Sequence, residues 1–344
     1  MSLGRRSVVN LAGAALPLLV SLPAVGALAR VLDAESFSLV LLAWALVGFA
    51  GILDLGLSRA VVRQVALERD HGQALDNTLR SAGSAAALLG LLGAGLIVLL
   101  REPLLAALGV SAALHDDAAR GLLWTALSVP LLLPALVLQS HWDGAEDFVE
   151  ANLQRALSGS LVPLLTLAGA LWQPRFSTAM IGLVAARALA LLLAVTRRGM
   201  ASRLRSGRVQ RRHLVELIRF GGWVTVSNTV SPIMNTLDRY LLGFVRGAAV
   251  VGFYAAPSDA ANKLLVLPVA VTRGLFPALA RDPDPLQRAT LLRDAYRLVA
   301  LYSVPIAVAG ALLAEPVLGL WLGPAFAARS TPALQVLMLS LIHI

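Results

Sequence analysis

The chain has 344 residues, of which 58% are hydrophobic and 14% are charged, and its mean hydropathy is +0.76. This balance excludes a soluble globular domain, and the lack of cysteine excludes a disulfide framework and thiolate chemistry. The net charge of +9 is typical of nucleic-acid binding, but the basic residues lie in short segments between apolar stretches. We therefore expect an all-α, polytopic helical membrane protein without a nucleic-acid partner.

Apolar stretches of about 20 residues, the length that crosses about 30 Å of hydrocarbon, recur along the chain. In chain order we predict spans at 8–29, 36–57, 78–100, 118–139, 157–173, 177–196, 220–245, 249–280 and 295–314, and a tenth that opens near Pro332. The first stretch follows Arg5 and Arg6, as in a secretory signal peptide. Its apolar segment is longer than a signal core, so we interpret it as the first span.

The arginines predict the orientation of these spans. With the N-terminus inside, the inner segments hold nineteen arginines and the outer ones six, which are Arg30, Arg101, Arg120, Arg175, Arg246 and Arg329. Basic residues accumulate on the cytoplasmic side of membrane proteins. We expect a multi-pass protein of the bacterial inner (plasma) membrane with a cytoplasmic N-terminus.

A basic segment divides the chain. RRGMASRLRSGRVQRRH at 197–213 is similar to a nucleic-acid-binding arm, but we interpret it as a cytoplasmic loop near anionic membrane lipids. The predicted domains are a six-helix lobe at 1–196, a basic cytoplasmic linker at 197–218 and a second lobe at 219–344. Six helices return the chain to the same side, so the lobes form a parallel pseudo-repeat.

The last predicted span is short. From Pro332 to Leu341 it covers about 15 Å, half of the hydrocarbon, where the last carbonyls of a helix would lack partners. The final residues, LSLIHI, also equal one reading frame of a common transposon-end sequencing adapter. We expect a truncated second lobe with about four of its six helices.

The sequence shows no catalytic motif. All predicted loops are short, and no P-loop, dinucleotide turn, HExxH motif or Cys/His cluster occurs. We therefore expect no enzyme, no catalytic residue, no cofactor and no metal. Function must then come from ionisable residues inside the spans, where each charge costs about 2.5–3.5 kcal/mol on insertion scales.

Few such residues exist. Arg187 lies in the middle of the sixth span, and either pairs with another helix or faces a cavity. Asp238 and Arg239 are neighbours about 100° apart on a helix, so their side chains cannot pair with each other. Asp259 and Lys263 are four residues apart and form either a local ion pair or a site. The candidate substrate-cavity residues are Lys263, Arg239, Arg187, Asp238, Asp259, Arg59 and Arg273, the last two near the inner ends of spans.

The segment TLDRYLLGFVRGAAVVGFYAAPSDAANKLLVLPVAVTRGLFPALAR at 236–281 resembles the polysaccharide (O-antigen type) flippase family of the multidrug/oligosaccharidyl-lipid/polysaccharide exporter superfamily. The resemblance rests on Asp238, Leu242–Gly243, Val251–Gly252, Tyr254, Lys263, Leu267–Pro268 and Phe276–Pro277. DLGLSRAVVR at 54–63 and WLGPAFA at 321–327 are similar to two further family signatures.

This resemblance implies two six-helix lobes around a central cavity, lined by helices one, two, seven and eight. It implies alternating access that carries a lipid-linked oligosaccharide from the cytoplasmic to the outer leaflet, with glycan polymerases as partners. Two other functions stay open. A cation-coupled multidrug exporter of the same superfamily would need an acidic site in the first lobe, and a membrane-embedded glycosyltransferase or polymerase would need a large outer loop.

Overall fold

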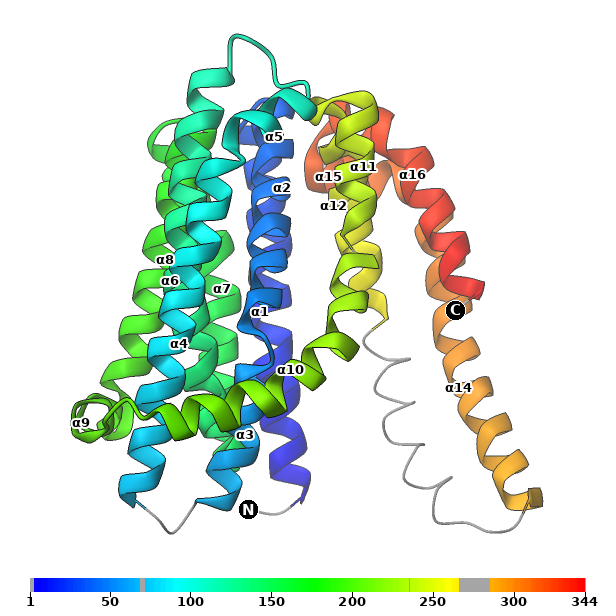
Figure 1. Cartoon of the computed structure of the whole chain (residues 1–344). Helices are drawn as coiled ribbons and strands as arrows, with labels where there is room; N and C mark the ends of the chain where they lie inside the picture. The colour runs from blue at the N-terminus through cyan, green and yellow to red at the C-terminus, as the bar shows by residue number, and fades with distance from the viewer. Residues whose placement is uncertain (1–2, 69–71, 235, 266–284, 344) are drawn as a thin grey trace. The chain divides into compact units, whose positions relative to one another are not determined.

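In the computed structural model the described backbone covers residues 3–68, 72–234, 236–265 and 285–343, and the described side chains cover 16–68, 72–222, 233–234, 236–265 and 287–340. All secondary structure elements within these ranges are helices, which agrees with the predicted all-α class (Figure 1). The chain forms two compact units, Met1–Val251 and Gly252–Ile344. The predicted lobes, 1–196 and 219–344, were defined as two structural repeats, and this division stays a prediction.

The first unit is a bundle of long helices joined by short ones. Its elements are α1 (Leu3–Val31), α2 (Ala34–Ala50), the 3₁₀ turn η1 (Gly51–Asp54), α3 (Leu57–Leu67), α4 (Gly72–Leu99), α5 (Arg101–Ala107), α6 (His115–Gly144), α7 (Phe148–Trp172), α8 (Phe176–Thr196), the 3₁₀ turn η2 (Arg197–Gly199), α9 (Met200–Ser206), α10 (Arg211–Met234) and α11 (Leu237–Arg246). The six predicted helices of the first lobe are confirmed as α1, α2, α4, α6, α7 and α8. The short helices α3, α5 and α9 were not predicted.

Within the described residues, six helical segments are long and apolar enough to cross a membrane. They are Ala34–Asp54, Gly72–Leu99, His115–Gly144, Phe148–Trp172, Phe176–Ser206 and Gln287–Leu312. The part of α1 whose side chains are described, Leu16–Val31, is apolar but shorter. The five segments that belong to the first unit pack side by side through their apolar surfaces, as α6 does against α4 and α8.

The prediction of a single seventh span at 220–245 is wrong. The helix that contains Phe220 begins at Arg211 and ends at Met234, and a separate helix begins at Leu237. Figure 1 shows α10 lying across the ends of the upright helices, where it contacts α3 and α4. The hydropathy of the sequence indicates that this stretch is apolar, but it does not indicate that the helix is interrupted between Met234 and Leu237. The interruption divides the stretch into the crosswise helix α10 and the short helix α11.

A tight turn holds α10 against the bundle. Asp54 ends η1 and accepts hydrogen bonds from the backbone N–H and the hydroxyl of Ser58, at 3.0 and 2.9 Å, which caps α3. Gly56 follows with φ of 71°, and a methyl group on it would lie 2.8 Å from the Cα of Gly221 in α10. The DLGLSR motif is therefore a helix cap combined with a close backbone contact that requires glycine on both sides.

The segment between α8 and α10 is folded onto α4. The Ser206 hydroxyl donates to the Asp76 carboxylate at 2.6 Å, and Arg203 pairs with the same carboxylate at 3.4 Å. The backbone N–H of Arg208 donates to the side-chain oxygen of Asn77 at 2.8 Å. The basic segment of the sequence thus packs along the end of the bundle that carries α9, which we call the α9 end; the opposite end carries α5.

The second unit contains α14 (Pro285–Leu312), α15 (Ala314–Leu322), α16 (Pro324–His343) and most of α12 (Ala248–Leu264). The predicted span at 295–314 is confirmed as the second half of α14, whereas 249–280 is confirmed only to Leu264, because 266–284 lie outside the described residues. The predicted start of the tenth span near Pro332 is wrong. WLGPAFA forms a turn in which Gly323, with φ of 98°, ends α15 and Pro324 opens α16.

Candidate functional site

The charged pair in TLDRYLLG lies on an amphipathic helix whose polar side faces the protein. In α11, Leu241 and Val245 are 52% and 77% exposed, whereas Arg239 and Tyr240 are 8% and 6% exposed. A lipid-facing helix places its apolar side chains outward and its charges against other helices. The sequence-based expectation that the charges need a partner other than lipid agrees with this arrangement.

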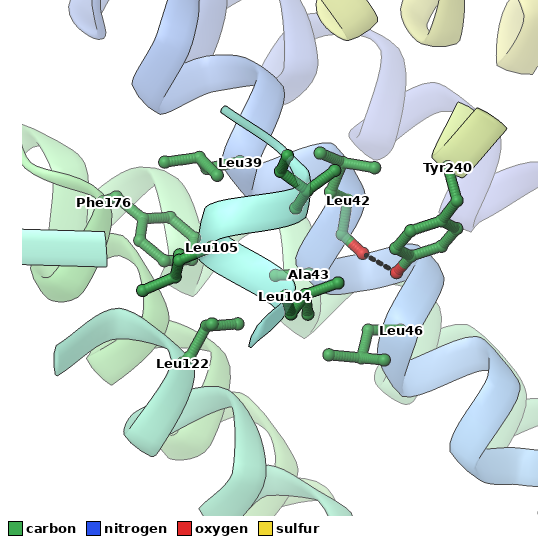
Figure 2. Close-up of a pocket in the computed structure, with 10 residues that line it drawn as sticks. Leu39, Leu42, Ala43, Leu46, Leu104, Leu105, Leu122, Phe176 and Tyr240 are labelled. Atoms are coloured by element: carbon green, nitrogen blue, oxygen red, sulfur yellow. Dashed lines mark hydrogen bonds between the residues drawn. The ribbon is translucent and has the colours of Figure 1, made fainter. Parts of the chain in front are cut away.

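Local bonds hold this face in position. The carboxylate of Asp238 accepts a hydrogen bond from the backbone N–H of Arg239 at 2.8 Å, near the start of the helix. The Tyr240 hydroxyl donates to the carbonyl oxygen of Leu42 in α2 at 2.8 Å, and its ring centroid lies 5.6 Å from that of Phe49 (Figure 2). Tyr240 thereby anchors α11 to α2 and places Arg239 beside it.

Arg187 lies on the buried face of α8. Leu183, Ala190 and Ala194, one or two turns away on the same face, are at most 2% exposed, while Arg187 is half-buried. Its Nε atom is buried and has no hydrogen-bond partner among the described residues. Because a desolvated cation without a partner is costly, this guanidinium is a candidate ligand for an anion.

Polar atoms of α7 lie at the same level as Arg187. The Gln154 side chain donates to the carbonyl of Ala190 at 3.0 Å, and a methyl group on Gly182 would lie 3.0 Å from the Cα of Thr166. These two contacts fix the antiparallel register of α7 and α8 and bring residues near Ser160 to the same axial level as Arg187. The Ser160 hydroxyl and the Gln154 carbonyl oxygen are also buried without a partner among the described residues.

The substrate-cavity residues predicted from the sequence did not include Gln154, Ser160 and Tyr240. Gln154 precedes the predicted span at 157–173, whereas α7 begins at Phe148, so this amide belongs to the helix. Serine and tyrosine are common in membrane helices, and only their three-dimensional neighbours distinguish them. One signal in the sequence could have identified Gln154: a polar amide lies directly before a long apolar stretch.

Apart from Asp238, the other predicted site residues do not lie on the helices that carry Arg187 and Arg239. Arg59 is exposed on α3 at the α9 end of the bundle, and Arg273 lies outside the described residues. Lys263 and Asp259 belong to the second unit, where both are half-buried on one face of α12 and interact electrostatically. No three His, Asp or Glu side chains in the described part of the chain group closely enough to hold a metal ion.

A small hollow lies beside Tyr240 (Figure 2). It is lined by Leu39, Leu42, Ala43, Leu46, Leu104, Leu105, Leu108, Leu122, Phe176 and Tyr240. Its volume of about 10 Å³ is near the minimum for one water molecule, and its walls are almost wholly apolar. The hollow is therefore a packing defect near the α5 end and not a binding site for a large substrate.

Comparison with known proteins decides the family. Residues 6–281 match the family model described as "Polysaccharide biosynthesis protein". The chain belongs to this family. A member of similar sequence, the "Putative O-antigen transporter" of Shigella flexneri, is 31% identical over 339 residues, which are 98% of this chain and 81% of the relative.

Solved structures show the fold of this polysaccharide biosynthesis protein. The lipid II flippase MurJ in an inward closed conformation matches with a TM-score of 0.75 at 15% identity, over 98% of this chain and 72% of MurJ. An inward-facing multidrug resistance MATE transporter of the MOP superfamily matches with a TM-score of 0.74 at 15% identity, over 98% and 81% of the two chains. The fold is thus the two-lobe helical fold of the MOP transporters.

Proposed function

We propose that this membrane protein is a flippase that moves a polyprenyl-(pyro)phosphate-linked oligosaccharide from the cytoplasmic to the outer leaflet by alternating access. The observation that carries this proposal is the 31% identity, over 98% of the chain, to a protein named as an O-antigen transporter. The named relatives are transporters, so we further propose that the chain is not an enzyme. A glycan polymerase that uses the exported unit is the protein partner we expect.

The charges of the first unit suit such a substrate. A polyprenyl phosphate head is anionic, and Arg187 and Arg239 are cations enclosed by helices. At an effective dielectric constant of about 20, opposite unit charges 4 Å apart attract by about 4 kcal/mol, about four times the value in bulk water. Lys263 would add a third cation, while Asp238 and Asp259 would orient these cations, and Arg59 and Arg273 would attract the head at the inner surface.

The alternative of a cation-coupled multidrug exporter rests on the MATE likeness, which concerns the fold alone at 15% identity. Such an exporter would need a carboxylate in the middle of a span of the first lobe. Among the described side chains of α2, α4 and α6, the carboxylates lie near helix ends, as Glu35, Asp76 and Asp117 do. This placement favours a flippase for an anionic lipid.

Deletion of the gene in its own host tests the function. We expect loss of surface glycan together with accumulation of the complete lipid-linked oligosaccharide on the cytoplasmic side, because synthesis continues while export stops. Lipid extraction and surface glycan electrophoresis measure both. Normal glycan with increased drug susceptibility would instead indicate an exporter, and loss of glycan without the complete lipid-linked unit would indicate a transferase.

Single cysteines test the proposed orientation, since the natural chain has none. We expect Ala113→Cys, which is exposed near the α5 end, to react with an impermeant thiol reagent in intact cells. Val209→Cys, which is 53% exposed at the α9 end, should react only after the membrane is permeabilised. The opposite pattern would show that the N-terminus is outside and would remove the basis for the direction of transport.

A further inference from the structure

We propose that α11 and the start of α12 form an outer latch, a releasable contact with α2 and the end of α5 that closes the transport path on the outer side. The latch consists of Tyr240, Ala248 and Ala249 on one side and Ser38, Leu42 and Leu108 on the other. This inference rests on the proposed function, because only an alternating-access transporter needs a seal that opens.

Three hydrogen-bond contacts join the two sides, and the acceptor in each of them is a backbone carbonyl oxygen. The Tyr240 hydroxyl donates to the Leu42 carbonyl at 2.8 Å, and the Ala248 N–H donates to the Leu108 carbonyl at 2.7 Å. The Ser38 hydroxyl donates to the Ala34 carbonyl of its own helix at 2.7 Å and shares this proton with the carbonyl of Ala249 at 3.3 Å. All three lie in the half of the bundle nearest α5, so that the contact closes one end only.

Glycines allow the two sides to approach closely. A methyl group on Gly243 would lie 2.7 Å from a terminal carbon of Leu108, so a larger side chain there would displace the end of that leucine. At the tip, a methyl group on Gly109 would lie 3.8 Å from the Cα of Gly247. Gly109 and Gly247 have φ of 57° and 86°, a backbone conformation that glycine adopts without strain.

The α2 and α5 side is held in place independently of α11. The backbone N–H of Ser111 donates to the carboxylate of Glu35 at 2.7 Å, which ties the loop after α5 to the start of α2. Leu105 is buried at 1% exposure against the bundle. The platform therefore belongs to the first lobe and stays with it when α11 moves.

The contact is suited to opening because it is small and contains no charged bond. Each neutral hydrogen bond changes an equilibrium by roughly twofold to tenfold. The apolar hollow of Figure 2 borders Tyr240. Separation of α11 from α2 would uncover Leu46, which lines this hollow one turn deeper on α2.

A cysteine at Leu46 reports opening. In membranes, Leu46→Cys should react slowly with an impermeant thiol reagent added from outside. Adding Tyr240→Phe, which removes the hydroxyl and keeps the ring, should raise the rate about twofold to tenfold because the open state becomes more populated. Tyr296→Phe, at a tyrosine that is 76% exposed on α14, should leave the rate unchanged.

Cross-linking provides a second measurement. A direct bond between the Ala248 N–H and the Leu108 carbonyl keeps the two Cα atoms within the distance of about 7 Å that a disulfide requires. Joining Leu108→Cys to Ala248→Cys with a short thiol cross-linker should suppress labelling at Leu46→Cys at least tenfold. Joining Glu35→Cys to Ser111→Cys, a contact within the platform, should not.

The inference is overturned if Tyr240→Phe leaves the labelling rate unchanged and the cross-link across the latch does not suppress it. It is also overturned if the Leu108 and Ala248 cysteines fail to cross-link under conditions where the platform pair does. Labelling requires no substrate. The two proposals can therefore fail separately. If the labelling shows that the latch opens but deletion of the gene leaves surface glycan unchanged, the proposed function is refuted and the latch is retained.

Discussion

Arg187→Met is expected to abolish surface glycan while the amount of folded protein in the membrane stays the same or rises. The guanidinium Nε is buried in the first unit without a hydrogen-bond partner among the described residues, so the charge stabilises nothing that the structure shows. Methionine keeps the length of the aliphatic stem and removes a charge that costs about 2.5–3.5 kcal/mol at the centre of a span. If the cation binds the substrate phosphate, activity falls although stability does not.

The variant should be expressed from the gene in its own host, with surface glycan measured by electrophoresis and protein by immunoblot. Arg187→Lys, which keeps the charge but not the fork of donors, should retain part of the export. Arg205→Met, at an exposed arginine of α9, is the matched control and should export normally. Normal glycan in Arg187→Met would remove Arg187 from the site, and loss of the protein would assign it a structural role.

Gly56→Ala is expected to lower the thermal stability of the purified protein strongly. With φ of 71°, alanine costs about 1–2 kcal/mol in backbone strain. Its methyl group would also lie 2.8 Å from the Cα of Gly221, a contact that real Cβ atoms do not make, so α10 must shift away from α3. The total loss should exceed about 2 kcal/mol, and a fluorescence melting curve in detergent measures it.

Gly48→Ala is the matched control for this glycine. Gly48 lies inside α2, and a methyl group there would meet no atom within 4 Å. Alanine in a helix interior is favoured over glycine by about 0.5–1 kcal/mol, so this variant should melt at the same temperature or slightly higher. Equal melting of the two variants would mean that α10 does not contact the turn at Gly56.

Most of the helical framework could be predicted from the sequence, because a span needs only enough apolar residues in a row. The six helices of the first lobe and the helix that ends at Leu312 follow from this rule, and the ordered motifs identified the family. Sequence also indicated that the side chains of Asp238 and Arg239 cannot pair with each other. That inference needs only the 100° step between neighbours on a helix.

Hydropathy could not locate where an apolar stretch breaks. Residues 220–245 are uniformly apolar enough for one span, yet α10 ends at Met234, and the same helix packs on α3 and α4 with Gly221 against Gly56. Likewise Pro332 is an apparent helix start, but Pro324 opens α16 after the turn at Gly323. The packing of α10 involves contacts between residues far apart in the sequence, whereas the start of α16 follows from the local turn at Gly323 and Pro324.

By itself, then, the sequence determined the helical membrane class, the family and the identity of the costly charges, because these depend on composition and local spacing. Only the tertiary structure decided which groups meet. It placed Arg187 at the level of Ser160 and Gln154 through the register of α7 and α8, and it joined Tyr240 to Leu42 across 198 positions of sequence. Helix packing sets these contacts, and a periodic apolar pattern is compatible with many packings.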